Sequence, residues 1–261
     1  MYRKEKSIFR SKNYLIAALV LLVTNWSGQA FAGERPAAGD LVDKADTFRQ
    51  PFDGSNLKVR LTSYRVEKQH DETNYHVWAS GNEKSLVAML NPKVRGQKVL
   101  MLPKGLWLHM PNSRRAIRIT PMQRLMGQAS YGDITQLRMG GLYKAAYDSA
   151  NPEGTVEGKN VWNLQLSSIK TNATYTKINL SIAKDSGLPV TAEFFLQSGK
   201  LLKKAVFGPL VKADGSTFIS TVTFFDSIKA NRKTIMTISE VKKKNFAGTD
   251  FSVRALARWK P

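Results

Sequence analysis

Residues 105–120, GLWLHMPNSRRAIRIT, predict two short strands joined by a turn. In the first half, large apolar side chains alternate with Trp107 and His109, which is the period-2 pattern of a strand. Proline, asparagine and serine at 111–113 favour a turn, because proline fixes φ and the other two side chains can bond nearby backbone. The second half is rich in arginine. The stretch therefore offers a broad apolar surface beside fixed positive charge, and it offers no nucleophile, metal site or phosphate-binding loop.

The same alternation extends in both directions along the chain. Each expected strand has apolar residues at every second position and ends at Gly, Asn, Asp or Pro turn signals. Several strands, such as residues 86–90, are apolar on both faces, so the sheet needs a cover that the few helices must supply. Strands are expected at residues 57–62, 73–79, 84–90, 96–102, 155–168, 175–184, 189–197, 201–210, 217–226 and 234–241.

Two segments depart from this alternation. Residues 40–49 have one apolar stripe and predict a helix, with Asp40 as its cap. Residues 121–147 carry glycines and methionines and predict a loop with one or two short helices, with Asp133 near a helix start. Roughly a dozen antiparallel strands and few helices predict a mainly β fold, in which a meandering sheet curls toward a barrel.

The composition is that of a globular protein with a large positive charge. The chain has 261 residues, 40 Lys and Arg against 20 Asp and Glu, and a formal net charge of +20. This charge favours anionic partners, which include nucleic acid, acidic lipid head groups and acidic proteins. The chain has no cysteine, which excludes disulfides, thiol catalysis and cysteine metal sites.

The N-terminus has the three parts of an export signal. A basic segment precedes the apolar run 14–23, YLIAALVLLV, which has the length of a signal-peptide core and is short for a membrane span. Residues 30–32, Ala-Phe-Ala, match a cleavage site, so cleavage after Ala32 is expected; an uncleaved anchor is the alternative. Removing residues 1–32 takes away five basic residues and one acidic residue and lowers the net charge to +16. Export argues against nucleic acid as a partner and predicts a single periplasmic domain over residues 33–261.

Catalytic motifs are weak in this sequence. His70, His76 and His109 share no metal-ligand spacing, and no Ser/His/Asp order of a known type is present. His76 and His109 fall in expected strands, and they would contact each other if the folded sheet pairs those strands at these positions. We therefore expect no enzymatic activity, no cofactor and no metal.

Residues 77–134 resemble the outer membrane lipoprotein-sorting protein family, the relatives of LolA and LolB. That family shows a tryptophan-bearing strand, a P-x-x-x-x-G segment, a W-L-Y-L-P-x-x-R-R-x-R-R-I hairpin and an F-M-G-S-D-F-S-Y-E-D stretch. The end of the chain, residues 241–258, also resembles the close of the family. His109 stands where the family usually has tyrosine. The matching residues are Trp78, Pro92, Gly96, Trp107, Leu108, Met110, Pro111, Arg114, Arg115, Arg118, Ile119, Met126, Gly127, Ser130, Tyr131, Asp133, Phe251 and Leu256.

The resemblance implies an unclosed, strongly curved antiparallel β-barrel covered by a helical lid, with a hydrophobic cavity for lipid or lipoprotein acyl chains. Such a cavity needs no reaction chemistry, because each buried CH₂ contributes roughly 0.8 kcal/mol. An inner-membrane transporter and an anionic membrane surface are further candidate partners. The candidate cavity lining is Trp78, Leu90, Met101, Leu106, Leu108 and Met126, and the candidate head-group or partner contacts are Arg114, Arg115 and Arg118.

Three function classes remain open from the sequence. A carrier would move acyl chains toward the outer membrane. A sensor or regulatory module would use the same fold to bind a lipid or protein partner, as in periplasmic regulators of membrane-anchored anti-sigma factors. A hydrolase on a β scaffold would require a nucleophile and a base that converge in the folded chain.

Overall fold

The computed structural model describes residues 35–261 except 121, 122, 124, 126–128, 248, 257, 260 and 261. Residues Met1–Arg35 and Pro36–Pro261 form separate units, and the fold below is that of the second unit. The predicted signal peptide and its cleavage after Ala32 lie outside the described residues, as does Met126.

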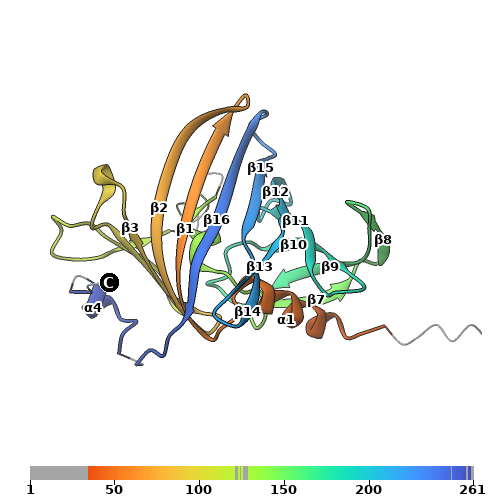
Figure 1. Cartoon of the computed structure of the whole chain (residues 1–261), viewed down its shortest axis with the longest axis horizontal. Coiled ribbons are helices and arrows are strands. Elements are labelled where there is room, and N and C mark those ends of the chain that lie inside the picture. The colour runs from red at the N-terminus through yellow and green to blue at the C-terminus, as the bar shows by residue number, and fades with distance from the viewer. Residues whose placement is uncertain are drawn as a thin grey trace, which may run out of the picture. The chain divides into compact units, whose positions relative to one another are not determined.

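One large antiparallel sheet of 14 strands makes up most of this unit (Figure 1). Its order is β6-β5-β4-β3-β2-β1-β16-β15-β12-β11-β10-β9-β7, with β8 paired to β9, and β13 and β14 form a separate hairpin. The sheet does not close into a barrel, because β6 and β7 lie at opposite ends of this order. The strands are β1 Gly54–Arg65, β2 Lys68–Ser80, β3 Lys84–Met89, β4 Lys98–Leu102, β5 Gly105–His109, β6 Ile117–Ile119, β7 Tyr143–Tyr147, β8 Glu153–Val156, β9 Lys159–Ser168, β10 Lys177–Ala183, β11 Pro189–Phe195, β12 Leu201–Phe207, β13 Leu210–Ala213, β14 Ser216–Ile219, β15 Thr221–Asp226 and β16 Arg232–Lys243.

The first and last strands meet in the middle of the sheet. β1 pairs with β16 in antiparallel register, with Leu61 opposite Met236 and Val59 opposite Ile238. On either side of this pair, most neighbouring strands also follow one another in sequence as hairpins, because period-2 apolar residues and tight turns favour local antiparallel pairing. The exceptions are β12, which pairs with β15, and β7, which pairs with β9. The sheet therefore consists of two meanders joined at one central pair.

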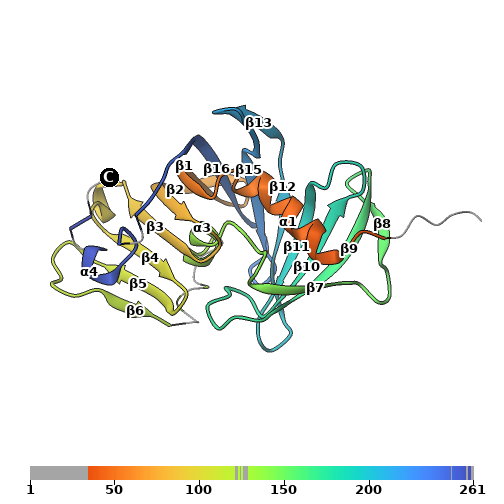
Figure 2. The ribbon, with the colours of Figure 1, turned by 90° about the horizontal axis from the view of Figure 1, so that it is seen from below.

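The two meanders bend around a shared apolar interior, and Figure 2 shows α1 and α3 lying between them. Leu41, Val42 and Ala45 of α1 are buried in this interior, and so is Ile134 of α3. The apolar stripe of α1 thus faces the sheet, as its spacing predicts. The helical segments are α1 Ala38–Arg49, the 3₁₀ turn Pro92–Val94, α3 Tyr131–Thr135 and α4 Val253–Leu256.

The outer face of strands β2–β5 has its own cover. Trp78, Leu86 and Leu100 are buried there against Phe251 and Leu256 of the C-terminal segment, which includes α4. The strands beneath this segment are therefore buried on both faces, which explains why β3, β4 and the last residues of β2 carry apolar side chains on both faces.

The mainly β, unclosed antiparallel fold with few helices is as predicted, and some element bounds differ. Residues 143–147 form the strand β7, although a loop or helix was predicted there. The predicted strands 155–168 and 217–226 are each two strands, interrupted at residues 157–158 and at Ser220. Asp40 is not the cap of α1: the helix begins at Ala38, and Asp40 lies in its first turn.

Candidate functional site

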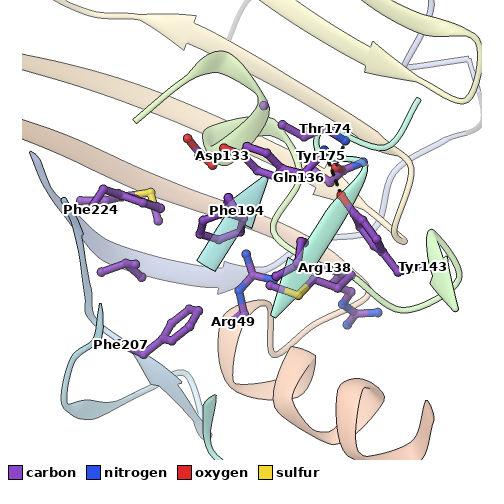
Figure 3. Close-up of a pocket in the computed structure, with 15 residues that line it drawn as sticks. Arg49, Asp133, Gln136, Arg138, Tyr143, Thr174, Tyr175, Phe194, Phe207 and Phe224 are labelled. Carbon is purple, nitrogen blue, oxygen red and sulfur yellow. Dashed lines mark hydrogen bonds between the residues drawn. The ribbon is translucent and has the colours of Figure 1, made fainter. Parts of the chain in front are cut away.

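The interior between the concave sheet face and the helices contains a small cavity (Figure 3). Its volume is about 20 Å³, which is room for about one water molecule. The side chains around this cavity therefore nearly fill it. The lining residues are Arg49, Gly132, Asp133, Gln136, Arg138, Met139, Tyr143, Thr174, Tyr175, Ile178, Phe194, Phe207, Val222, Phe224 and Met236.

Aromatic rings form one wall of the cavity. The ring centroids of Tyr175 and Phe194 are 4.5 Å apart, and those of Phe194 and Phe224 are 6.4 Å apart. All three side chains are buried. This wall is apolar because Phe194 of β11 and Phe224 of β15 occupy inward positions, next to Ala192 and Val222.

A buried ion pair crosses this apolar interior. Lys203 Nζ of β12 lies 2.5 Å from Asp133 Oδ2 of α3, and the two side chains are 2% and 4% exposed. The ammonium also lies 5.2 Å from the ring centroid of Phe224 and 5.5 Å from that of Tyr175. Removing two charges from water costs several kcal/mol per ion, which pairing and further hydrogen bonds offset.

Further donors complete the environment of the Asp133 carboxylate. The Tyr175 hydroxyl donates to Oδ1 at 2.5 Å, and the Ser130 backbone amide and hydroxyl donate to Oδ2 at 2.6 and 2.8 Å. Burial, and secondly the charge of Asp133, raises the pKa of Tyr175 well above its usual value. The Tyr175 hydroxyl therefore keeps its proton and acts as a donor.

Polar contacts also hold the segment after α3 to the surrounding strands. The Gln136 side chain donates to the Asn172 carbonyl and accepts from the Thr174 amide. Ser85 of β3 donates to the Thr135 carbonyl at 2.6 Å. Residues 130–140 are thus fixed to the sheet by hydrogen bonds as well as by the buried side chains of Ile134, Leu137 and Met139.

Two arginines lie at the α1 end of the cavity, as Figure 3 shows. Arg49 lies with its guanidinium carbon 5.8 Å from the ring centroid of Phe207 and pairs with Asp46. Arg138 donates to the Gln50 carbonyl at 2.9 Å. The cavity is therefore apolar in its middle and charged at both ends.

A larger groove of about 660 Å³ adjoins the cavity. The two share Thr174 and Tyr175, so these side chains form the wall between them. The remaining groove lining mixes apolar and polar side chains and contains one lysine: Thr120, Leu125, Ser168, Lys170, Thr171, Ala173, Thr176, Phe195, Leu196, Gln197 and Ser198.

Three of the residues predicted to line a cavity face the interior together. Met101 and Leu106 are buried there and are directly paired between β4 and β5, and Leu108 packs against the same cluster. Leu90 follows β3 and is half-buried. None of these four described residues borders the small cavity of Figure 3.

Trp78 lies on the opposite face of the sheet. It is 1% exposed and stacks on His76 with 4.0 Å between the ring centroids, beneath the C-terminal Trp259. The structure therefore separates Trp78 from Met101, Leu106 and Leu108, because alternate residues of paired strands point to opposite faces.

The predicted basic contacts lie at the β6 edge of the sheet. Arg114, Arg115 and Arg118 are exposed. Arg118 lies with its guanidinium carbon 5.8 Å from the Trp107 ring centroid and donates to the Lys104 carbonyl at 2.5 Å. None of the three borders the cavity or the groove described above.

The histidines do not converge. His76 and His109 share one row across the sheet, but Ala88 of β3 and Lys98 of β4 lie between them. Burial, and secondly the Lys98 charge, lowers the pKa of His109. Among the described residues, no group of three His, Asp or Glu side chains is placed to hold a metal ion.

The sequence interpretation did not select Lys203, Tyr175 or the pairing of Asp133. A signal for Lys203 was present: in β12 it occupies the same face as Ala205, which is buried in the interior. A lysine at an inward strand position needs a buried anionic partner. The identity of that partner depended on tertiary contact with α3.

Three bacterial proteins are among the solved structures that share this fold. A LolA superfamily protein from Nitrosomonas europaea has a TM-score of 0.76 and 27% identity, covering 84% of this chain and 98% of that chain. A DUF1329 family protein from Desulfovibrio piger has a TM-score of 0.69 and 19% identity, covering 84% and 98%. A putative outer membrane lipoprotein-sorting protein domain from Vibrio parahaemolyticus has a TM-score of 0.67 and 17% identity, covering 85% and 98%.

The unclosed sheet with its helix-filled interior therefore defines a LolA-like protein, which confirms the resemblance of residues 77–134. A family profile described as "Uncharacterized protein" matches residues 81–258, and the chain belongs to that family. No curated protein sequence matches the chain. In the part of the chain that the structure describes, no helix has the length and apolar character to span a membrane.

Proposed function

We propose that the protein is a periplasmic carrier that binds acyl chains of a lipid or lipoprotein in its hydrophobic interior and helps deliver them toward the outer membrane. The observation that supports this proposal best is the apolar interior bounded by α1 and α3, with a groove of about 660 Å³ beside it. Because the interior itself holds only about 20 Å³ of free space, acyl binding requires the segment around α3 to move away from the sheet.

The carrier proposal involves no chemical reaction. The described histidines lie apart, and the buried Asp133 and Lys203 are bonded to each other and to neighbouring groups. Transfer of an acyl chain then depends on burial of its CH₂ groups, at roughly 0.8 kcal/mol each. The fold shared with a putative lipoprotein-sorting domain also supports this assignment.

Periplasmic location follows from the proposed signal peptide. N-terminal sequencing of the exported protein should find a mature chain that begins at Gly33. A chain that begins at Met1 and stays with the inner-membrane fraction would contradict the proposed export.

Mass spectrometry of lipids that co-purify with the protein from the periplasm tests the carrier function. We expect acyl lipids or lipoprotein at near-stoichiometric amounts, and uptake of a fluorescent fatty acid by delipidated protein. If neither result is obtained under conditions where a known lipoprotein carrier gives both, the carrier function is contradicted. The regulatory module would then be the better hypothesis.

A further inference from the structure

Burying the Lys203 ammonium group in an apolar interior costs free energy. Its side chain is 2% exposed, and Phe224 and Tyr175 lie beside it. Replacing a buried ion pair by apolar residues of similar volume is often neutral or stabilising, so stability alone does not account for this lysine. A role in binding does account for it, because a cation in an apolar site attracts an anionic group strongly.

The anionic partner of Lys203 is on the part of the protein that must move. Asp133 belongs to α3, which has five residues and is held to the sheet by hydrogen bonds and by the buried side chain of Ile134. When α3 separates from the sheet, Asp133 leaves with it, whereas Lys203 stays on β12. The open interior therefore presents an ammonium group on its apolar wall.

The groove adjoins the ion pair through Tyr175, although Lys203 itself borders neither the groove nor the cavity. Tyr175 and Thr174 form the wall between groove and cavity, and the Tyr175 hydroxyl donates to the carboxylate that Lys203 binds. The groove contains Leu125, Phe195 and Leu196, which suit an acyl chain. A ligand that enters along the groove, with its chain in the opened interior, would place its head group at Tyr175 and Lys203.

We propose that Lys203 anchors the anionic head group of the acyl ligand, and that Asp133 occupies this anchor in the empty protein. The ligand class is an acyl or alkyl chain that ends in a carboxylate or phosphate. Its oxygens replace those of Asp133 as acceptors for Lys203 and for the Tyr175 hydroxyl, and binding of the head group is thereby coupled to release of α3. This inference rests on the proposed carrier function and adds the charge of its ligand.

Binding of four probes with one chain length tests the charge preference. The probes are palmitate, hexadecyl phosphate, methyl palmitate and hexadecylamine, and acetate and inorganic phosphate serve as head groups without a chain. We expect the full-length mature protein to bind the two anionic probes at least about tenfold more tightly than the ester, since a charge-assisted hydrogen bond contributes about that factor. Hexadecylamine should bind most weakly.

Variants of Lys203 and Asp133 distinguish a head-group anchor from an ion pair that only stabilises the fold. Asp133→Asn removes the internal competitor and should tighten palmitate binding several-fold, whereas Lys203→Met should weaken it about tenfold or more. A structural role would instead lower thermal stability in both variants and change affinity in the same direction. Lys203→Arg should keep the preference for anions.

A double variant addresses loss of folding in the single variants. Asp133→Leu combined with Lys203→Met removes both charges and should stay folded. It should bind palmitate and methyl palmitate with equal affinity. Equal affinity for these probes in the wild-type protein, or an anion preference that persists in the double variant, would overturn the anchor while leaving the carrier function intact. Failure of every chain-bearing probe to bind would overturn the carrier function and the anchor with it.

Discussion

The side chain of Asp46 in α1 accepts a 2.6 Å hydrogen bond from the backbone amide of Gly140, which lies 94 residues further along the chain. A second bond of 2.6 Å from the Met139 amide reaches the same oxygen. These bonds tie α1 to the segment that follows α3. The carboxylate is buried, and burial raises the pKa of Asp46 above its ordinary value of 3.8, although Arg49 opposes the shift.

The raised pKa of Asp46 predicts that this residue makes the unfolding free energy depend on pH, and Asp46→Asn should remove that contribution. Since the pKa is raised in the folded protein, the folded state binds this proton more tightly than the unfolded state does. The associated stabilisation is present below pH 3.8 and is lost as pH rises through the raised pKa. In urea titrations, the unfolding free energy of the Asn variant should therefore increase relative to that of the wild-type protein as the pH rises through this window. A difference between the two proteins that does not vary with pH would contradict the prediction.

Gly132→Ala should destabilise the protein because α3 lies against Thr174 at this position. An added Cβ would lie 2.2 and 2.6 Å from the Thr174 methyl and hydroxyl atoms. We expect a loss of about 1–3 kcal/mol in unfolding free energy, the usual cost of overpacking. Gly39→Ala in α1 is the matched control, since nothing lies within 4 Å of its added Cβ. Thr174→Ala should recover part of the loss, and equal stability of the Gly132 and Gly39 variants would contradict the proposed contact.

Phe251→Ala should release the C-terminal segment from the outer face of the sheet. The ring is 5% exposed, and its centroid lies 5.1 Å from that of Phe246 and 6.1 Å from that of Trp259. We expect a loss of about 3 kcal/mol and faster proteolysis within residues 244–261, because the segment loses its central aromatic contact. Phe225→Ala, at a ring that is 42% exposed, should change neither quantity much. Unchanged proteolysis of the Phe251 variant would show that other contacts hold the segment.

Leu108→Glu should abolish uptake of a fluorescent fatty acid. Leu108 packs against the interior cluster, and an unpaired carboxylate in an apolar site costs several kcal/mol. Lys243→Glu at an exposed position should change uptake little. Circular dichroism must show that the Leu108 variant is folded, and normal uptake by the folded variant would place the acyl chain elsewhere.

The sequence predicted the fold class well because each strand must bury one face. Period-2 alternation located most strands, and the apolar stripe of α1 located its helix. β7 was missed although Tyr143, Ala145 and Tyr147 alternate, since glycines and methionines around it favoured an irregular segment. The turn between β1 and β2 was also hard to predict, because Val66 and Glu67 adopt positive φ angles of 49° and 60° without glycine.

The site was less predictable than the fold. Alternation shows that a strand has two faces, but it does not show which face is concave, and Trp78 lies on the outer one. The pairing of Asp133 with Lys203 joins residues 70 positions apart. No local pattern encodes such a contact, since it depends on how the sheet bends around α3.

The central pairing of β1 with β16 has a consequence for how the chain folds. Each meander can form from contacts between neighbours in sequence, whereas this pair must close a loop that contains nearly the whole domain. Loop closure of this kind is slow, because its entropic cost precedes any gain from contact. We therefore expect the two meanders to form early and the pairing of β1 with β16 to limit the folding rate. During this interval the edges of both strands are still unpaired, so the folding chain is most prone to aggregate before β1 and β16 meet.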